Sequence, residues 1–294
     1  MPKSKPSLTI IGAGRLGTAM AIALSGVGYP IHSFVSRHRP RLKQAAQLLD
    51  KKVSLLVLEE LREVGEIVLI TTPDDQLSVV TTHLCNLNVK RRRHQVALHT
   101  SGAVSSKMLS PLSDRHWRVG SIHPLVSVSE ARIGAKSLVS AFWCLEGDRM
   151  AVQQSRRIVE DLRGHSFSIK SRAKPLYHAA AVMASGNIVA LFDTALDMLE
   201  CSGLKKERAH EVLIPLLQST MANLSTSSTA RALTGTFSRG DVATVERHLK
   251  ALAGSELRDA RELYRLLGRK SLALAEENGL NKMTASKIHK LLEE

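Results

Sequence analysis

The chain has 294 residues, with 41 lysines and arginines against 27 aspartates and glutamates, which gives a formal net charge of +14. This length suits two ordinary domains, each able to bury a core of its own. The positive charge predicts a phosphate-bearing partner, and nucleic acid is one candidate. Against nucleic acid, aromatic residues make up only 3% of the chain, so few rings are available for base stacking.

The spacing of the cysteines and the N-terminal residues indicate the cellular compartment of the protein. Cys85, Cys144 and Cys201 lie far apart without a CxxC spacing, which predicts neither a disulfide framework nor a zinc ribbon and fits a reducing cytoplasm. The start, MPKSKPSLTIIG, lacks the features of a signal peptide. The longest apolar-rich run, 179–192, contains Asn187 and is shorter than the ~20 residues of a membrane span. We therefore expect a cytoplasmic protein that does not enter a membrane.

Short apolar runs alternate with helical patterns through the first half of the chain. The strand-like runs are LTIIG, PIHSFV, EIVLITT, QVALHT and RVGSIH, and apolar residues at helical spacing cover 17–28, 41–49 and 76–87. Such repeated strand–helix–strand units predict a doubly wound parallel sheet with helices on both faces. A strand FWCLEG, a helix over 150–162 and a strand HSFSI are expected to complete this domain near residue 170.

Strand signals disappear after residue 170. Helical patterns cover 177–200, 205–224, 242–252, 256–278 and 283–292. Asp241 is placed to cap one helix and Gly279 to end another, while STSSTA at 225–230 is expected to form a polar loop. The sequence thus predicts an N-terminal α/β domain, residues 1–170, and an all-helical domain, residues 171–294.

A glycine-rich loop follows the first strand. The segment LTIIGAGRLGTAMAIAL places Gly12, Gly14 and Gly17 in GxGxxG spacing directly between a strand and a helix. Gly12 permits the tight turn, Gly14 lets the backbone approach a pyrophosphate, and Gly17 lets the helix pack closely on the strand. The backbone at Arg15 and Leu16 completes this site at the helix N-terminus. A turn that binds nothing is the alternative, but the flanking elements favour a dinucleotide-binding loop.

The residues after the second strand predict which dinucleotide binds. A chain specific for NAD usually has Asp or Glu at this place, about 20 residues beyond the loop, whereas this chain has Ser36 and Arg37. A carboxylate would repel a 2′-phosphate, but a hydroxyl and a guanidinium can bind it, with Arg39 or Arg41 adding positive field. We therefore expect NADP(H) as the cofactor, the alternative being a solvated basic turn.

A second basic run, KRRRH at 90–94, precedes the fifth strand. Because ligands of such sheets bind at the carboxyl ends of the strands, this run is expected to lie at the opposite edge and to face solvent. Contact with nucleic acid or another partner is the alternative there.

Polar residues end the fourth strand. Thr71, Thr72 and Pro73 are expected to contact the nicotinamide end of the cofactor. Asp74 and Asp75 follow them and are expected to cap the next helix.

The next two strands end in histidine motifs. HTSG brings His99 and Ser101 beside the expected cofactor and Gly102 beside the expected substrate, and SIHP brings His123 to the end of the sixth strand. Ser101 and His123 are also candidates for substrate binding. Since no histidine pair has a convincing metal-ligand spacing, we predict no metal.

Four segments, LHTSGAVS, VGSIHPLVSV, YHAAAVMASGN and GTFSRGDVATVERHL, together resemble bacterial Rossmann-like proteins that carry a helical C-terminal domain of uncharacterised function. These proteins lie in the superfamily of pyrroline-5-carboxylate reductase, 3-hydroxyisobutyrate dehydrogenase and 6-phosphogluconate dehydrogenase. The resemblance covers nearly the whole chain. It implies an NADP-binding Rossmann domain, a substrate cleft between the domains and a homodimer formed through the helical half. Some members have been linked to ketopantoate reduction, so a small keto acid is the first substrate to test.

The resemblance does not identify the proton donor. Hydroxyacid dehydrogenases of the superfamily use a lysine on the first helix of the second domain, but the corresponding region here has Tyr177 and His178. Lys170 and Lys174 precede that helix and are not expected to reach the site.

Reduction of a carbonyl needs a proton donor as well as a hydride, and a histidine suits that task near neutral pH. His178 is the first candidate, with a structural role as its alternative, and His123 is the second. Asn187 is the third, because a separation of nine residues on one helix places it about opposite His178. Ser185 and Arg239 complete the candidate substrate-binding residues, Arg239 as the ligand of a substrate carboxylate.

These features favour an NADPH-dependent oxidoreductase that reduces a small anionic keto acid or an imine. An NADP-binding sensor without turnover is the alternative from another class, because a fold does not establish a reaction. A nucleic-acid binder is the third hypothesis, and it predicts affinity that falls steeply with salt.

Overall fold

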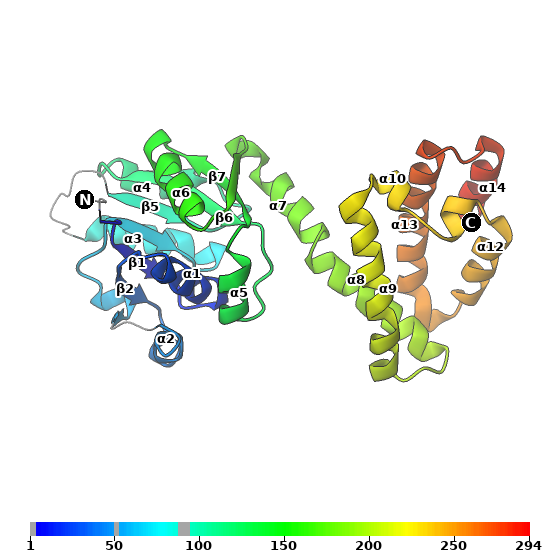
Figure 1. The fold of residues 1–294 in the computed structure, drawn as a ribbon, viewed down its shortest axis with the longest axis horizontal. Coiled ribbons are helices and arrows are strands. Elements are labelled where there is room, and N and C mark those ends of the chain that lie inside the picture. Colours follow the sequence, from blue (N-terminus) through cyan, green and yellow to red (C-terminus); the bar gives the residue numbers. More distant parts are fainter. Residues whose placement is uncertain (1–3, 50–52, 88–94) are drawn as a thin grey trace. The chain divides into compact units, whose positions relative to one another are not determined.

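A computed structural model describes residues 4–49, 53–87 and 95–294, and Figure 1 shows its ribbon coloured along the chain. The chain divides into two compact units, Met1–Ser185 and Gly186–Glu294. The sequence analysis placed the domain boundary at residue 170, whereas the first compact unit also includes the next helix. The basic run at 90–94 lies outside the described residues.

A single sheet forms the centre of the first unit. In the described part of the chain it has eight strands in the order β3-β2-β1-β4-β5-β6-β7-β8. The strands are β1 (Leu8–Ile11), β2 (Ile31–Val35), β3 (Ser54–Leu56), β4 (Ile67–Ile70), β5 (Val96–His99), β6 (Arg118–Pro124), β7 (Phe142–Gly147) and β8 (His165–Ser168). Because the strand order changes direction between β1 and β4, the edge at the carboxyl ends of these two strands is the expected place for a ligand.

Buried side chains cover both faces of this sheet. β1 and β4 are buried along their whole length, which is typical of parallel strands between two layers of helices. Ile10 of β1 belongs to one hydrophobic cluster and Ile11 to the other, because successive side chains of a strand point to opposite faces. This arrangement confirms the predicted doubly wound α/β fold.

Each cluster includes its own set of helices. The first cluster contains residues of α1 (Arg15–Gly26), α2 (Arg39–Ala46), α5 (Ala131–Ser137) and α6 (Arg149–Asp161). The second contains residues of η1 (Leu58–Glu60), α3 (Leu77–Asn86), η3 (Ser106–Leu109) and α4 (Ser110–Ser113). The predicted helical stretches of the first half therefore lie in the layers that cover the sheet.

The last two strands, β7 and β8, run opposite to the other six and so depart from the predicted parallel sheet. β7 pairs antiparallel with β6, whereas the other described pairs of neighbouring strands are parallel. The backbone N–H of Leu125, directly after β6, donates to the carbonyl of Phe142, the first residue of β7, at 2.9 Å. β7 therefore begins at the edge where β6 ends, and no crossover connection carries the chain back to the other edge.

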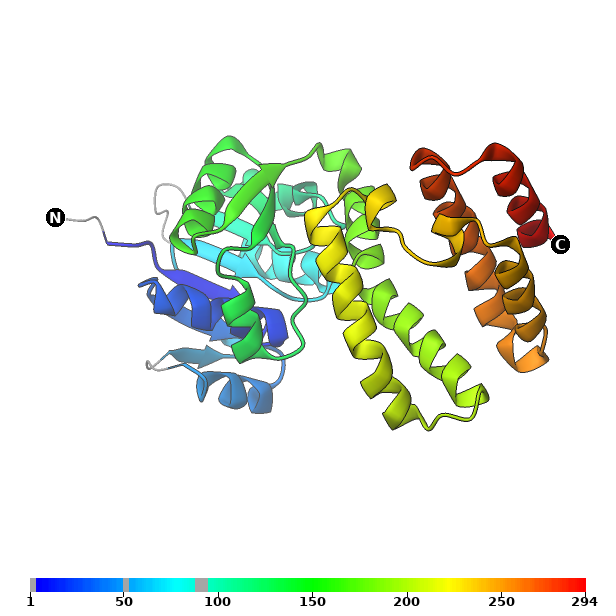
Figure 2. The same cartoon turned by 45° about the vertical axis from the view of Figure 1, so that its right-hand side comes forward.

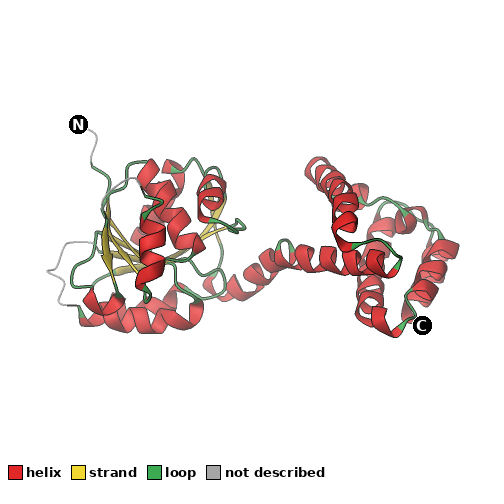
Figure 3. Ribbon diagram, turned by 90° about the horizontal axis from the view of Figure 1, so that it is seen from below, coloured by secondary structure: helices red, strands yellow, loops and turns green. Residues whose placement is uncertain are grey.

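The second unit is helical, as predicted, and Figure 3 shows the yellow strands within the first unit. Its helices are α8 (Gly186–Cys201), α9 (Lys206–Thr226), α10 (Thr229–Ala232), α11 (Thr236–Arg239), α12 (Val242–Ala251), α13 (Arg258–Glu277) and α14 (Lys282–Glu293). A small core of Val245, Leu272 and Ile288 joins α12, α13 and α14. The carboxylate of Asp241 caps α12 by accepting from the backbone N–H of Thr244 at 3.0 Å, which confirms the predicted cap.

Two details of the helical half differ from the prediction. The single helix expected over 177–200 is two helices, α7 (Lys174–Met183) and α8, and the residues between them include Ser185. Serine and the adjacent Gly186 are weak helix formers, which accounts for the break. The loop expected at 225–230 is shorter, because α9 continues to Thr226 and α10 begins at Thr229.

Helices α8 and α9 lie side by side in Figures 1 and 2 and expose much apolar surface. Val189 of α8 is 70% exposed and Leu216 of α9 is 63% exposed. The stretch Ser171–Cys201, with mean hydropathy 1.5, is long and apolar enough to cross a membrane by length and composition, and 6% of its apolar window is buried. It is longer than the run at 179–192 that the sequence analysis considered.

The close packing of α1 on the glycine loop predicts the effect of adding one methyl group. A Cβ at Gly17 would overlap the carbonyl oxygen of Gly12 and the hydroxyl of Thr71. Gly17→Ala should therefore lower the free energy of unfolding by about 1–3 kcal/mol, the usual cost of overpacking. Gly26→Ala in the same helix is the control, since its Cβ would meet nothing within 4 Å. Equal stability of the two variants in urea denaturation would contradict the described packing.

Candidate functional site

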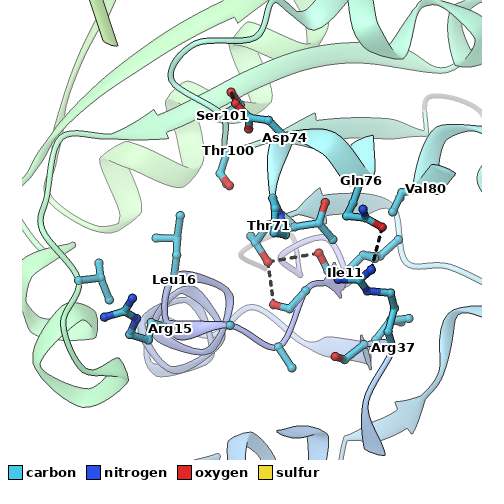
Figure 4. A pocket seen from close by; sticks show the side chains of 18 of the residues that line it. Ile11, Arg15, Leu16, Arg37, Thr71, Asp74, Gln76, Val80, Thr100 and Ser101 are labelled. Atoms are coloured by element: carbon cyan, nitrogen blue, oxygen red, sulfur yellow. Dashed lines mark hydrogen bonds between the residues drawn. The ribbon is translucent and has the colours of Figure 1, made fainter. Parts of the chain in front are cut away.

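A cavity of about 590 Å³ opens at the carboxyl edge of the sheet in the first unit, and Figure 4 shows it from close by. The loops after β1, β2, β4, β5 and β6 contribute to its lining, together with one residue of α7. The predicted site residues that line it are Gly12, Gly14, Arg15, Leu16, Ser36, Arg37, Thr71, Thr72, Pro73, Ser101, Gly102, His123 and His178. Residues from six separate segments of the chain therefore meet at one edge.

The remaining predicted residues do not line this cavity. Gly17 is buried where α1 meets the glycine loop. His99 is fully buried, and its Nδ1 accepts from the backbone N–H of Ser101 at 3.2 Å. Ser185 is exposed at the end of the first unit, and Asn187 and Arg239 are exposed in the second. The expected opposition of Asn187 and His178 assumed one continuous helix, which the chain does not form.

The glycine loop is held against the end of β4. Gly12 has φ +125°, in the region that favours glycine, and a Cβ there would lie 2.7 Å from the carbonyl carbon of Thr71. The hydroxyl of Thr71 donates to the Gly12 carbonyl at 2.8 Å (Figure 4). A Cβ at Gly14 would meet nothing within 4 Å, and the first turn of α1 has no acidic residue. This space beside the unpaired amides of a helix N-terminus suits a phosphate group.

Three arginines follow β2, which neighbours β1 in the sheet. Arg37 Nη1 donates to Gln76 Oε1 at 3.0 Å (Figure 4), so a neutral amide holds this guanidinium without cancelling its charge. Arg39 instead forms an ion pair with Glu60. Arg41 lines the cavity. Of the two arginines that the sequence suggested as additional positive charge, Arg41 is therefore the better placed.

The two aspartates after β4 do not cap a helix, so both predicted caps were wrong. The chain enters a 3₁₀ turn at Asp74 itself, which places Asp74 and Asp75 inside the turn and not before it. Asp74 Oδ2 accepts from the hydroxyl of Ser101 at 2.9 Å, and Asp75 Oδ2 accepts from the amide of Gln76 at 3.1 Å. Asp74 thus links the loop after β4 to the loop after β5.

Two histidines and a tyrosine meet beside Gly102. His123 Nδ1 lies 2.7 Å from the hydroxyl oxygen of Tyr177. The His123 and His178 rings stand edge to face with centroids 5.6 Å apart. A Cβ on Gly102 would lie 2.8 Å from His123 Nε2 and 2.5 Å from His178 Nδ1, so only glycine lets both rings approach this loop so closely.

The electrostatic environment keeps His123 neutral. Burial, aided by the neighbouring His178 and Lys174, lowers the pKa of His123 to about 4. Burial likewise raises the pKa of Tyr177, so its hydroxyl keeps its proton at neutral pH. These two groups therefore meet as an uncharged phenol and an uncharged imidazole.

Lys174 was expected to precede the helix, but it is the first residue of α7. As expected, it does not line the cavity. Its side chain is fully buried behind the cavity wall, and Nζ donates to the Ser101 carbonyl at 2.8 Å and to the Ser121 hydroxyl. Burial lowers the pKa of Lys174, and the negative charge of Glu146 opposes this effect. Helix α7 begins at Lys174, and Pro175 in its first turn was the sequence signal for that earlier start.

Glu146 holds the chain just before α7. Its carboxylate accepts from the backbone N–H of Ser106 at 2.9 Å and from the hydroxyls of Ser106 at 2.8 Å and Ser171 at 2.6 Å. Burial acts to raise the pKa of Glu146, but these hydrogen bonds and the nearby Lys174 charge outweigh it and leave the pKa below its ordinary value. Together Glu146 and Lys174 tie η4 (Ser171–Ala173) and α7 to the sheet, which explains why this helix belongs to the first unit.

Two protein-family models match separate parts of the chain. Residues 1–124 match the model of a Rossmann-like domain, and residues 141–271 match the model of a domain of unknown function, DUF2520. Both descriptions agree with the resemblance seen in the sequence, but the second match begins before β7 and so includes the last two strands of the sheet. No curated protein matches the chain.

Among solved structures, a Thermotoga maritima protein is similar over 92% of this chain and 99% of its own, with 25% identity and a TM-score of 0.70. A pyrroline-5-carboxylate reductase from Streptococcus pyogenes is similar over 99% and 98%, with 16% identity and a TM-score of 0.55. An imine reductase from Myxococcus stipitatus in complex with NADP+ is similar over 98% and 93%, with 14% identity and a TM-score of 0.56. At these identities the two reductases show a shared fold.

His99 predicts part of the pH dependence of stability. Burial, with a smaller effect of Lys174, lowers the pKa of His99 from 6.5 to about 4. Between these values the unfolded chain binds a proton that the folded chain does not, so the free energy of unfolding falls as the pH drops from 6.5 to 4. Each pKa unit corresponds to about 1.4 kcal/mol, so this residue accounts for on the order of 3 kcal/mol.

Urea denaturation of the wild type and of His99→Gln from pH 7 to pH 4 measures this effect. Glutamine keeps an acceptor for the Ser101 N–H but does not titrate. The variant should therefore lose less stability over this range, whereas parallel curves for the two proteins would contradict the assignment.

Proposed function

We propose that the protein is an NADPH-dependent oxidoreductase that reduces a small carbonyl or imine compound. The observation that carries this proposal is that one cavity joins the glycine loop, the Ser36–Arg37 pair and the His123–His178 pair. The fold shared with a pyrroline-5-carboxylate reductase and an NADP+-bound imine reductase supports it. A small keto acid of the ketopantoate type, or an imine, is the proposed substrate.

The described residues fit NADP. The pyrophosphate would lie at the open space beside Gly14 and the start of α1. The 2′-phosphate would bind Ser36 and Arg37, with Arg41 contributing positive charge. Thr72 lines the cavity near the nicotinamide end, and its buried hydroxyl has no partner among the described residues. When bound, NADPH supplies a hydride.

Positive charge is distributed unevenly along the cavity, and this suggests where the substrate binds. The lining arginines of the described chain come from the loop after β1 and from the residues after β2. The lining around His123 instead includes Gly102, Pro124 and Val126. We propose that this second end binds the reacting carbonyl or imine and that a histidine donates the proton. Arg239 stays the proposed ligand of a substrate carboxylate.

Binding and turnover are tested separately. Calorimetry with NADPH and with NADH tests the cofactor site, and loss of NADPH absorbance with ketopantoate, related keto acids and cyclic imines tests the reaction. NADPH binding with no oxidation by any of these compounds would favour the sensor without turnover. Absence of heat with both dinucleotides would overturn both functions.

Cofactor preference is predicted to depend on Arg37. Arg37→Ala should weaken NADPH binding about 10- to 100-fold, as expected for loss of one charged hydrogen bond to the 2′-phosphate. The same change should leave NADH binding nearly unaltered. Arg39→Ala is the matched control, because Glu60 already pairs with this arginine. Equal losses for NADPH and NADH in calorimetry would remove the assignment of the 2′-phosphate site.

We also propose a homodimer formed through the helical unit, in the cytoplasm. Leu196 is the buried residue of α8 and Ala209 that of α9, so both helices leave apolar side chains uncovered in one chain. Such surface usually marks a protein or membrane contact. The ion pairs of Asp193 and Asp197 with Lys206 disfavour a bilayer around α8 and support a second copy as the partner. The free thiols of Cys85, Cys144 and Cys201 support a reducing compartment.

Light scattering after size exclusion tests the dimer. The wild type should have a mass near twice the 32.1 kDa of one chain. Leu216→Glu should shift the protein toward the monomer, because it places a charge in the apolar surface. Ile133→Glu is the control, as it makes the same kind of change at an exposed apolar residue of α5 in the first unit. A monomeric wild type would contradict the proposal.

A further inference from the structure

We propose that Tyr177 is the positioning residue of His123, and that the Nε2–H of His123 donates the proton to the substrate. This inference rests on the proposed reductase function and selects one donor from the three candidates. It follows from the hydrogen bond between the two side chains, from the position of His123 at the cavity, and from the lack of a comparable hydrogen bond to His178 among the described residues.

The hydrogen bond between Tyr177 and His123 determines which ring nitrogen carries the proton. The two atoms, Tyr177 Oη and His123 Nδ1, are 2.7 Å apart. The phenol stays protonated and must find an acceptor for its hydrogen. Besides His123, the sulfur of Cys144, opposite His123 in β7, is near enough to affect the pKa of Tyr177. Because a thiol sulfur is a weak acceptor, the hydroxyl donates to His123 Nδ1.

A neutral imidazole that accepts at Nδ1 carries its hydrogen at Nε2. His123 and Gly102 both line the cavity, and Nε2 lies beside Gly102. The tyrosine therefore presents the Nε2–H at the cavity wall, at the end away from the arginines. The helix α7 that holds Tyr177 is fixed in turn by Lys174, one turn earlier.

His178 is less suited to the same task. Its Nδ1 is buried beside Gly102 and has no hydrogen-bond partner among the described residues. This nitrogen therefore cannot donate directly to a bound molecule. Among the described residues His178 also lacks a hydrogen bond such as the one from Tyr177 to His123, so nothing there fixes a hydrogen on its Nε2. His178 instead packs edge-on against His123 and fixes the plane of that ring. The first candidate of the sequence analysis thus becomes a packing residue, and the second becomes the donor.

The proton balance closes within the pair and one water molecule. As the carbonyl carbon accepts the hydride, the π electron pair of the C=O bond moves to the oxygen, which takes the proton from His123 Nε2. The Nδ1 atom takes the hydroxyl proton of Tyr177. As a water molecule then protonates Nε2, Nδ1 returns its proton to the phenolate oxygen and hydroxide leaves, which restores the starting tautomer. The imidazole never becomes a cation. This route suits a ring that faces Lys174 and His178 and that also lies near His99 and Cys144.

The tautomer is tested without cofactor or substrate. Nitrogen-15 NMR of the full-length labelled protein, with the His123 signals assigned from His123→Gln, should show hydrogen on Nε2 and none on Nδ1 between pH 6 and pH 8. Tyr177→Phe removes the donor to Nδ1 and should produce a mixture of the two tautomers. Hydrogen on Nδ1 in the wild type would overturn the proposal.

Proton donation is tested with two kinds of substrate. In the full-length enzyme, His123→Gln should lower kcat for a ketone about 10²- to 10⁴-fold, the usual size of general acid catalysis. Reduction of an N-methylated cyclic iminium ion, which needs no proton, should fall far less than reduction of the ketone. Tyr177→Phe should lower kcat for the ketone with little change in KM. His178→Gln should lower kcat for the ketone less than His123→Gln does.

Calorimetry and thermal melting of each variant separate this inference from the proposed function. Unchanged NADPH affinity and melting temperature show that a lost activity comes from the donor. Equal ketone reduction by wild type and His123→Gln, or equal loss on the ketone and the iminium ion, would overturn the donor assignment alone. Failure of the wild type to bind NADPH would overturn the reductase function instead.

Discussion

The candidate site depends on one buried ammonium group. Lys174 donates from α7 to the backbone of the loop after β5 and to a side chain of β6, and it has no contact with solvent. Burying an unpaired charge is costly, so these bonds and the nearby Glu146 carboxylate must persist in the folded protein. Because α7 is held in this way, His178 on its next turn lines the cavity and Tyr177 reaches His123.

The two ends of the cavity differ in burial and in charge. Near the glycine loop, open backbone amides and exposed arginines favour phosphate groups. At the other end, burial and the charge of Lys174 keep His123 uncharged. The cavity therefore joins an uncharged imidazole at one end to a region suited to anions at the other. A Cβ at Gly17 would overlap the carbonyl oxygen of Gly12, so α1 packs directly on the glycine loop.

The sequence predicted the parts of the site whose structure depends on residues close together in the chain. The GxGxxG loop, the Ser36–Arg37 pair after β2 and the motifs at the strand ends can each be recognised from a few adjacent residues. Residues from all three groups line one cavity. The errors have local causes too. Asp74 was taken as a cap because aspartates often precede helices, but the turn begins one residue earlier than that role requires. A single helix was expected over 177–200 because its apolar pattern runs through the break at Ser185.

What the sequence by itself determined is the alternation of strands and helices, the glycine loop and the change to an all-helical half, since hydrophobic periodicity and turn chemistry act over short distances. What only the tertiary structure decided is which side chains meet. The bond of Tyr177 to His123, the antiparallel β7 and the burial of Lys174 join residues that are far apart along the chain. No local pattern encodes such contacts, because they arise when strands and helices pack and displace water from the groups between them.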